Sequence, residues 1–154
     1  MKLRIIAAGL AAFIACLPVA HAADQNMGVI SFENSGAPAA QADFISGLAA
    51  LHNFQYPLAA RLFQRAQAAD PDFALAYWGE AMAHDHPVWH EQDLKAARAA
   101  LAKLGATPEA RAAKAKTPRE QAYLAAVEIL FGVGDDNDRD RHFARVERAV
   151  PAVP

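Results

Sequence analysis

The stretch from residue 44 to residue 83 constrains the fold more than any other part of the chain. It carries apolar residues at helical spacing and is interrupted twice by short segments that end helices. Four of its residues follow one another at intervals of four, three and five: Ala59, Phe63, Ala66 and Pro71. Because residues four and three apart share one helical face, the first three predict a buried helix with a helix on either side.

The same four positions match the second half of the tetratricopeptide repeat, A-x3-F-x2-A-x4-P. A unit of about 34 residues beginning at Ala40 aligns the two halves of the stretch. The aligned pairs are Phe44 with Trp78, Gly47 with Ala81, Leu48 with Met82, and His52 with His86. The match weakens after His84, where the loop is longer than the repeat allows. We therefore expect an all-α fold, an irregular tetratricopeptide-like array of antiparallel helix hairpins with about five to six helices.

Beyond the repeat, the chain resembles a group of bacterial secreted tetratricopeptide proteins. The likeness covers about residues 41 to 133 and rests on three segments: LHNFQY at 51–56, DPDFALAYWGEAMA at 70–83 and HPVW at 86–89. The resemblance implies a helical scaffold within a longer chain and conveys no catalytic residue. Since the sequence ends in AVPAVP at 149–154, where such proteins continue into further helices, we expect a truncated member.

The N-terminus has the layout of a secretory signal peptide. Lys2 and Arg4 precede an apolar run, and a small-residue A-x-A site ends at Ala22. The apolar run is shorter than the roughly 20 residues that a membrane span needs. We expect cleavage near Ala22 and a periplasmic or secreted protein. The alternative is a lipoprotein anchored at Cys16, which follows a loosely lipobox-like segment at 13–15.

Charge and cysteine content limit the classes of partner. Removal of residues 1–22 takes two of the 15 Lys and Arg and none of the 17 Asp and Glu, so the net charge becomes 13 minus 17, or -4. No basic surface for nucleic acid is expected, and the only cysteine leaves with the signal peptide. We expect a protein or peptide partner, no nucleic acid, no membrane span and no cofactor.

The rest of the chain divides into an extended leader, residues 23–40, and a helical domain, residues 41–150. The leader either lies on the first helix through a strand-like segment at 29–32 or forms a mobile arm. The first predicted helix begins at residue 41. The next ones span residues 57–69, 71–84, 91–104, 107–114 and 117 to about 131, and a last amphipathic segment contains Phe143 and Val146.

Helix ends and helix faces yield finer predictions. Thr117 and Glu120 form a capping box, Asp70 caps the helix from 71, and Gly105 is a left-handed helix stop. On the helix from 57 to 69, Gln67 is expected to face water together with three neighbours: Arg61, Gln64 and Arg65. On the helix from 117, the expected buried stripe is Tyr123, Ala126, Val127 and Leu130.

In tetratricopeptide proteins, the row of aligned residues lines the concave face. The resemblance therefore implies a partner surface made of Leu48, His52, Trp78, Met82 and His86. Aromatic and methionine side chains are common at interfaces, and methionine adapts its shape to a partner. The alternative is that Trp78 and Met82 belong to the core.

A second class of function is metal binding by His84, His86 and His90, with Asp85 and Glu91 nearby. Imidazole nitrogens suit zinc and copper, and a carboxylate can complete the ligand set. Pro87 opposes this, because it interrupts the helix that would bring His86 and His90 together. The alternative is a turn with exposed histidines.

Other acidic residues give weaker signals. Asp136, Asp138 and Asp140 have the spacing of a calcium loop, with Glu147 at its twelfth position, but Arg141 stands where the sharp turn requires glycine. A solvated acidic loop is the better interpretation. Glu80 and Glu128 are single carboxylates without a paired acid or base, so we do not expect an enzyme.

Overall fold

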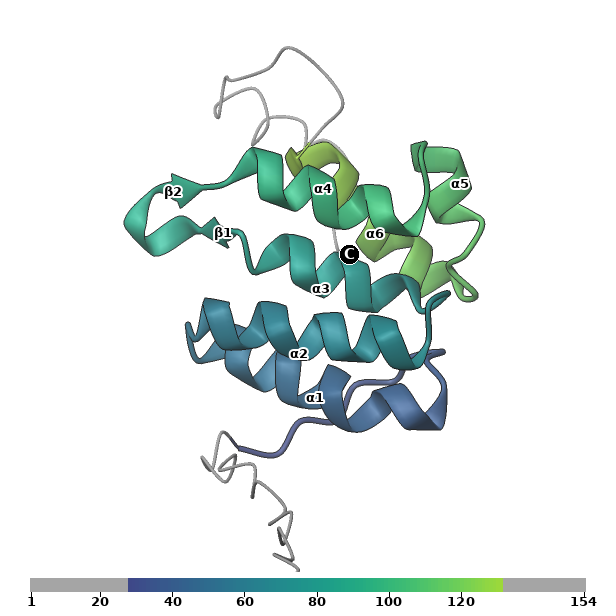
Figure 1. Cartoon of the computed structure of the whole chain (residues 1–154), viewed down its shortest axis with the longest axis horizontal. Coiled ribbons are helices and arrows are strands. Elements are labelled where there is room, and N and C mark those ends of the chain that lie inside the picture. Colours follow the sequence, from purple (N-terminus) through teal and green to yellow (C-terminus); the bar gives the residue numbers. More distant parts are fainter. Residues whose placement is uncertain (1–27, 132–154) are drawn as a thin grey trace, which may run out of the picture.

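A computed structural model describes residues 28–131, and this part of the chain is all-α (Figure 1). Its helices are α1 (Pro38–His52), α2 (Tyr56–Ala69), α3 (Ala74–Met82), α4 (Leu94–Leu104), α5 (Pro108–Ala112) and α6 (Pro118–Phe131). The predicted all-α class is confirmed here, whereas the tetratricopeptide arrangement stays a prediction. The predicted signal peptide, the acidic loop after residue 132 and the last amphipathic segment lie outside the described residues.

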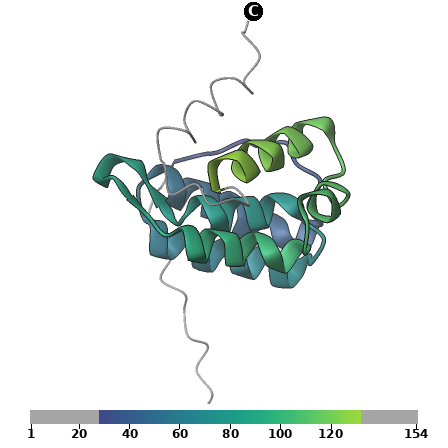
Figure 2. The ribbon, with the colours of Figure 1, turned by 90° about the horizontal axis from the view of Figure 1, so that it is seen from above.

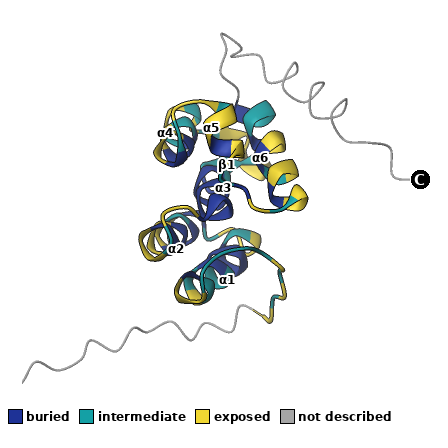
Figure 3. Cartoon of the chain, turned by 90° about the vertical axis from the view of Figure 1, so that its right-hand side faces the viewer, coloured by how far each residue is buried: buried dark blue, intermediate teal, exposed yellow. Residues whose placement is uncertain are grey.

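Helix α3 is the centre of the fold. Helices α1 to α4 lie side by side in sequence order, and α6 covers α3 from another side (Figures 1 and 3). Eight of the nine residues of α3 are buried, which fits a helix that contacts α1, α2, α4 and α6. Apart from Glu80, the helix is apolar or aromatic on every side, so the sequence ALAYWGEAM favours a central place with neighbours all round.

The Phe63 ring joins the first three helices. It is fully buried and lies between Gly47 of α1 and Gly79 of α3. A Cβ atom on Gly79 would stand 2.4 Å from Cε1 of Phe63, and one on Gly47 would stand 2.9 Å from it. Both positions therefore admit only glycine while the ring stays in place.

The leader is held against the helices between residues 28 and 37, where it forms no strand. The Phe32 ring sits between Phe44 of α1 and Tyr123 of α6, with centroids 5.8 and 5.7 Å away. The Ser35 backbone N–H and hydroxyl donate to the buried Glu120 carboxylate at 2.7 and 2.8 Å. Figure 2 follows this purple segment past α6. The leader thus joins the first helix to the last described one.

The predicted capping box of α6 is confirmed. Thr117 Oγ1 accepts from the Glu120 N–H at 3.2 Å, and Glu120 Oε2 accepts from the Thr117 N–H at 3.3 Å. Asp70, however, does not cap α3. Its carboxylate accepts from the N–H of Ala37, the residue before α1, at 2.8 Å. Gly105 also differs from the prediction, because it ends α4 in an extended conformation with φ of -178°.

Three helices begin three residues away from the predicted positions. Helix α1 begins at Pro38 instead of residue 41, and α3 begins at Ala74 because Pro71 and Asp72 form a turn. Between α3 and α4, β1 (Asp85–His86) pairs antiparallel with β2 (Glu91–Gln92) around the 3-10 turn η1 (Pro87–Trp89). This hairpin occupies the residues predicted to begin α4, so α4 starts three residues later, with Asp93 as its N-cap.

Two predictions of burial are wrong. Gln67 is buried, because its amide donates to the Ala76 carbonyl and to Glu80. On α6, the buried side chains are Glu120, Leu124, Val127 and Phe131, whereas the predicted Ala126 is exposed. The buried face of α6 therefore begins at Glu120, the glutamate of the capping box, which Ser35 of the leader contacts.

Candidate functional site

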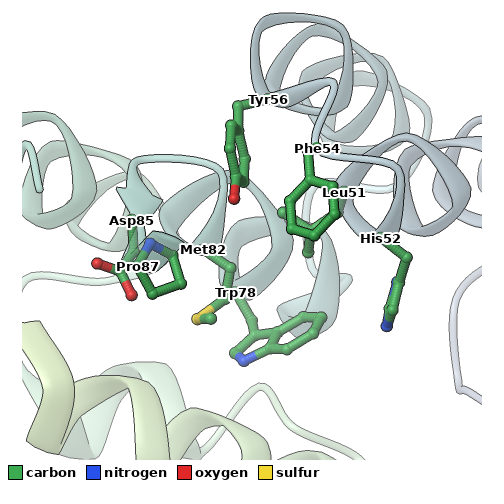
Figure 4. Close-up of a pocket in the computed structure, with 8 residues that line it drawn as sticks. All are labelled: Leu51, His52, Phe54, Tyr56, Trp78, Met82, Asp85 and Pro87. Atoms are coloured by element: carbon green, nitrogen blue, oxygen red, sulfur yellow. The ribbon is translucent and has the colours of Figure 1, made fainter. Parts of the chain in front are cut away.

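Two adjoining hollows form a groove that shares His52 and Trp78 as common walls. The first, which we name the aromatic pocket, has a volume of about 340 Å³ (Figure 4). Its lining comes from the end of α1 (Leu51, His52), the α1–α2 connection and the start of α2 (Phe54, Tyr56), α3 (Trp78, Met82), and the hairpin (Asp85, Pro87). The second, the leader pocket, measures about 510 Å³ and is lined by Ile30, Phe32, Leu48, His52, Asn53, Trp78 and Tyr123.

The walls of the aromatic pocket are held in place from behind. The Trp78 ring meets Tyr123 of α6 edge-on at 5.0 Å. His52 is fixed at the end of α1 by a 2.8 Å hydrogen bond between its Nδ1 and the Leu48 carbonyl. The Tyr56 hydroxyl points into the pocket above Met82 (Figure 4). These contacts make the pocket a preformed feature of the fold.

Phe54, Tyr56 and Trp89 form what we name the exposed aromatic cluster after its two exposed members, Phe54 and Trp89, whereas Tyr56 is buried. Phe54 and Tyr56 line the aromatic pocket, and the Trp89 ring contacts both of them. The three rings meet edge-on, with centroid separations of 5.8 to 6.3 Å. His86 stacks on Tyr56 at 4.1 Å. Phe54 and Trp89 are 56% and 54% exposed, although their side chains are among the most apolar in the chain. Contiguous exposed apolar surface is typical of interaction sites.

The backbone of both connections is unusual at this end of the molecule. Phe54 and His90 have φ of 59° and 54°, and in residues 28–131 no other residue except glycine has a positive φ. Such conformations cost of order 1–3 kcal/mol and occur often at functional sites. One of the two carries a ring of the cluster, and the other follows Trp89 directly. The geometry that exposes these rings is therefore maintained against a local cost.

The electrostatics of the pocket centre on Asp85. Its carboxylate accepts from the Gln92 side-chain amide at 3.2 Å across the hairpin. Burial raises the pKa of Tyr56, and the negative charge of Asp85 raises this pKa further. Across the hairpin from His86, Glu91 lies 3.6 Å from the imidazole Nδ1. The apolar pocket thus has an acidic edge.

The structure brings four of the five predicted partner-binding residues to the groove. His52, Trp78 and Met82 line the aromatic pocket, and Leu48 lines the leader pocket with only 1% of its surface exposed. His86 stands behind Tyr56 and contacts the groove through that ring. Sequence reasoning missed Phe54, Tyr56 and Trp89 as site residues, although all three belong to the segments that carry the family resemblance. Whether these residues bind a partner stays a prediction.

The three histidines offered as metal ligands are spread along the hairpin. His86 Nε2 lies 3.2 Å from the Ala83 carbonyl, His84 is half-buried at the end of α3, and His90 is exposed. In the part of the chain from 28 to 131, no group of three or more His, Cys, Asp or Glu side chains is placed to hold a metal ion.

The single carboxylates noted in the sequence have structural partners. Glu80 is buried and accepts from Lys103, Gln64 and Gln67 at 2.6 to 2.7 Å. Burial acts to raise the pKa of Glu80, but these hydrogen bonds and the Lys103 charge outweigh it, so the pKa lies below its ordinary value. Glu128 forms a two-pronged ion pair with the buried Arg111 guanidinium. Both groups bind helices together.

Within the described residues, every helix is too short or too polar to cross a membrane. Comparisons of the chain with protein-family models, with curated proteins and with solved structures gave no match.

Proposed function

We propose that the chain is an exported helical scaffold of tetratricopeptide type, which binds a peptide segment of a partner protein in the groove. The observation that carries this proposal is the exposed aromatic cluster beside a preformed apolar pocket. Export rests on the signal-peptide pattern before residue 23 and is a separate part of the proposal.

The exposure of Phe54 and Trp89 has a clear energetic meaning. Fully burying a large apolar side chain stabilises by about 1.5–3 kcal/mol. Because Phe54 and Trp89 are about half exposed, the folded chain gains only part of this free energy from each ring. A partner that covers them gains the remainder without having to reorganise the pocket behind. Aromatic residues are enriched in interface centres for this reason.

The shape of the groove favours a peptide segment as the occupant. Its two hollows meet at His52 and Trp78, so an occupant can continue from one into the other. Ile30 and Phe32 of the leader already line the far part, which means that one extended segment lies against this surface in the folded chain. A second segment placed beside the leader would contact the same row of apolar side chains.

The binding test uses the chain's own tryptophans. Of its two Trp residues, Trp78 lines both pockets, and Trp89 contacts Phe54 and Tyr56 of the aromatic pocket lining, so intrinsic fluorescence should report on occupation. Peptides selected from a random library against the chain lacking residues 1–22 should change this fluorescence and bind with 1:1 stoichiometry in calorimetry. A Phe54→Ala, Trp89→Ala double variant should weaken binding at least about tenfold.

The matched control is Val29→Ala, which also removes exposed apolar surface but lies outside both linings. It should leave peptide affinity unchanged. The proposal fails if selection yields no peptide, or if the double variant binds the selected peptides as tightly as the unaltered chain.

A further inference from the structure

The aromatic pocket combines ring surfaces with a negative edge. Phe54, Tyr56 and Trp78 present aromatic surface to it, Met82 adds a polarizable thioether, and Asp85 is its one carboxylate. Ring faces and thioethers are apolar contacts that also tolerate or attract positive charge. An occupant that matches all of these groups has a hydrocarbon part and a cationic end.

The surrounding sequence adds to this match. Between Arg65 and Lys95, a stretch that supplies α3 and the hairpin, the chain has six carboxylates and no Lys or Arg. Helix α1 and the connection to Tyr56 also contain no Lys or Arg. The charged and titratable groups at the aromatic pocket are Asp85, His52 and the Tyr56 hydroxyl in its lining, with His86 and Glu91 beside them. The Arg119 guanidinium of α6 lies over the Phe32 and Tyr123 rings of the adjoining leader pocket.

The aromatic pocket is large enough for one long side chain. About 340 Å³ lies at the lower end of the roughly 300–1,000 Å³ of small-molecule sites. A purely apolar side chain would fill the pocket but would make no electrostatic contact with Asp85. A long cationic side chain buries its stem and leaves its charged end at the edge.

We propose that the aromatic pocket binds a Lys or Arg side chain of the partner peptide, with the stem against Tyr56 and Trp78 and the cationic group beside Asp85. This inference rests on the proposed function and specifies its partner as a basic peptide. The continuity of the pocket with the leader pocket favours a side chain on a peptide over a free amine.

The test compares three probes on the chain lacking residues 1–22, by NMR of the Trp indole N–H signals. They are Nα-acetyl-lysine methylamide, Nα-acetyl-norleucine methylamide and n-butylammonium. The lysine probe should bind at least about fivefold more tightly than the norleucine probe, which has a closely similar stem without the charge. This preference should decrease at high salt.

Asp85→Asn should reduce the preference to less than about twofold while leaving the melting temperature nearly unchanged. The control Glu109→Gln also removes one negative charge, but on exposed α5, at the other end of the molecule from the hairpin (Figure 1). It should keep the full preference.

Each other outcome overturns the inference in a recognisable way. Equal binding of the lysine and norleucine probes, no binding of either, or an unchanged preference in Asp85→Asn rejects a cationic side chain. Butylammonium binding as tightly as the lysine probe would assign the pocket to free amines. Selected peptides that bind at the groove but lack basic residues would reject this inference and leave the proposed function standing, whereas the absence of any peptide binding would reject both.

Discussion

Two clusters of aromatic rings in this protein have similar contact geometry and differ in exposure. In the buried cluster, Phe32, Phe44, Phe63 and Phe73 meet at 4.7 to 5.9 Å, and Phe44, Phe63 and Phe73 are fully buried. In the exposed aromatic cluster, the rings meet at 5.8 to 6.3 Å, and two of the three are more than half exposed. Ring-to-ring contact therefore does not by itself identify a core.

The difference lies in what supports the rings. Phe44 and Phe63 stand on helices whose apolar faces meet neighbouring helices, so their burial follows from helix packing. Phe54 and Trp89 stand on connections, one of them with a left-handed backbone. Rings of the first kind should contribute mainly to stability, and rings of the second kind mainly to binding.

The largest effect is expected from Phe44→Ala. Removing this fully buried ring should lower the free energy of unfolding by about 3–5 kcal/mol, because it leaves a cavity among Phe32, Phe63 and Phe73. The same change at Phe54 should cost no more than about 1 kcal/mol. Urea denaturation of both variants measures the difference, and equal losses would contradict the contrast between the clusters.

Gly79→Ala should cost about 1–3 kcal/mol through overpacking, because the new Cβ would fall 2.4 Å from the enclosed Phe63 ring. A smaller side chain at position 63 should relieve the clash. In a double-mutant cycle measured by denaturation, Gly79→Ala with Phe63→Leu should therefore cost less than the sum of the two single changes. Strict additivity would show that the ring and the glycine do not constrain each other.

The Glu80 network should give the core a distinct acid sensitivity. Since the pKa of Glu80 is lowered in the folded chain, its contribution to stability is present above the ordinary value of 4.5 and is lost as pH falls through the lower folded value. Glu80→Gln should cost about 1–3 kcal/mol at pH 7 and should flatten the decline of stability below pH 4.5.

Removing the positive charge of Lys103 tests the same hydrogen-bond network around Glu80. Lys103→Met takes away a positive charge and a hydrogen bond, so the pKa of Glu80 in the folded chain should rise, and the loss of stability below pH 4.5 should be smaller than in the unaltered chain. Melting temperatures measured from pH 3 to pH 7 would reveal both effects. A variant with the same pH profile as the unaltered chain would contradict this role of Glu80.

The smallest effect is expected from comparing two changes at Phe54. Because φ there is 59°, glycine should be more stable than alanine by about 0.5–1 kcal/mol. Both variants lack the ring, so both should bind the selected peptides about equally weakly. Thermal denaturation and fluorescence titration separate the two properties, and an alanine variant as stable as the glycine variant would show that the backbone there is not strained.

The sequence was informative where local rules and packing agree. Ala59, Phe63 and Ala66 are fully buried as their spacing predicts, and the capping box at Thr117 is present. It was less informative where a distant segment decides the outcome. Glu120 anchors a leader 85 residues away, and Asp70 accepts from an N–H 33 residues away, so neither contact follows from local pattern.

In the candidate site too, residues on helices could be predicted from the sequence, whereas residues in the connections could not. Periodicity and the aligned repeat indicated His52, Trp78 and Met82, which stand on helices or at a helix end. Phe54, Tyr56 and Trp89 meet only because the hairpin returns toward the α1–α2 connection. Periodicity assigns no face to residues in such connections, so their convergence could not be predicted from it.

The hydrogen bonds between Ser35 and Glu120 join segments that are made at different times, which has a consequence for the order of folding. A ribosome releases residue 35 long before residue 120, so the Phe32 ring must wait for Tyr123 before it is enclosed on both sides. Contacts of such high sequence separation tend to form late and slow the search for the native state. Until α6 is made, the side of the Phe32 ring that Tyr123 covers stays exposed, so we expect the leader, although synthesised first, to be among the last described segments to become ordered.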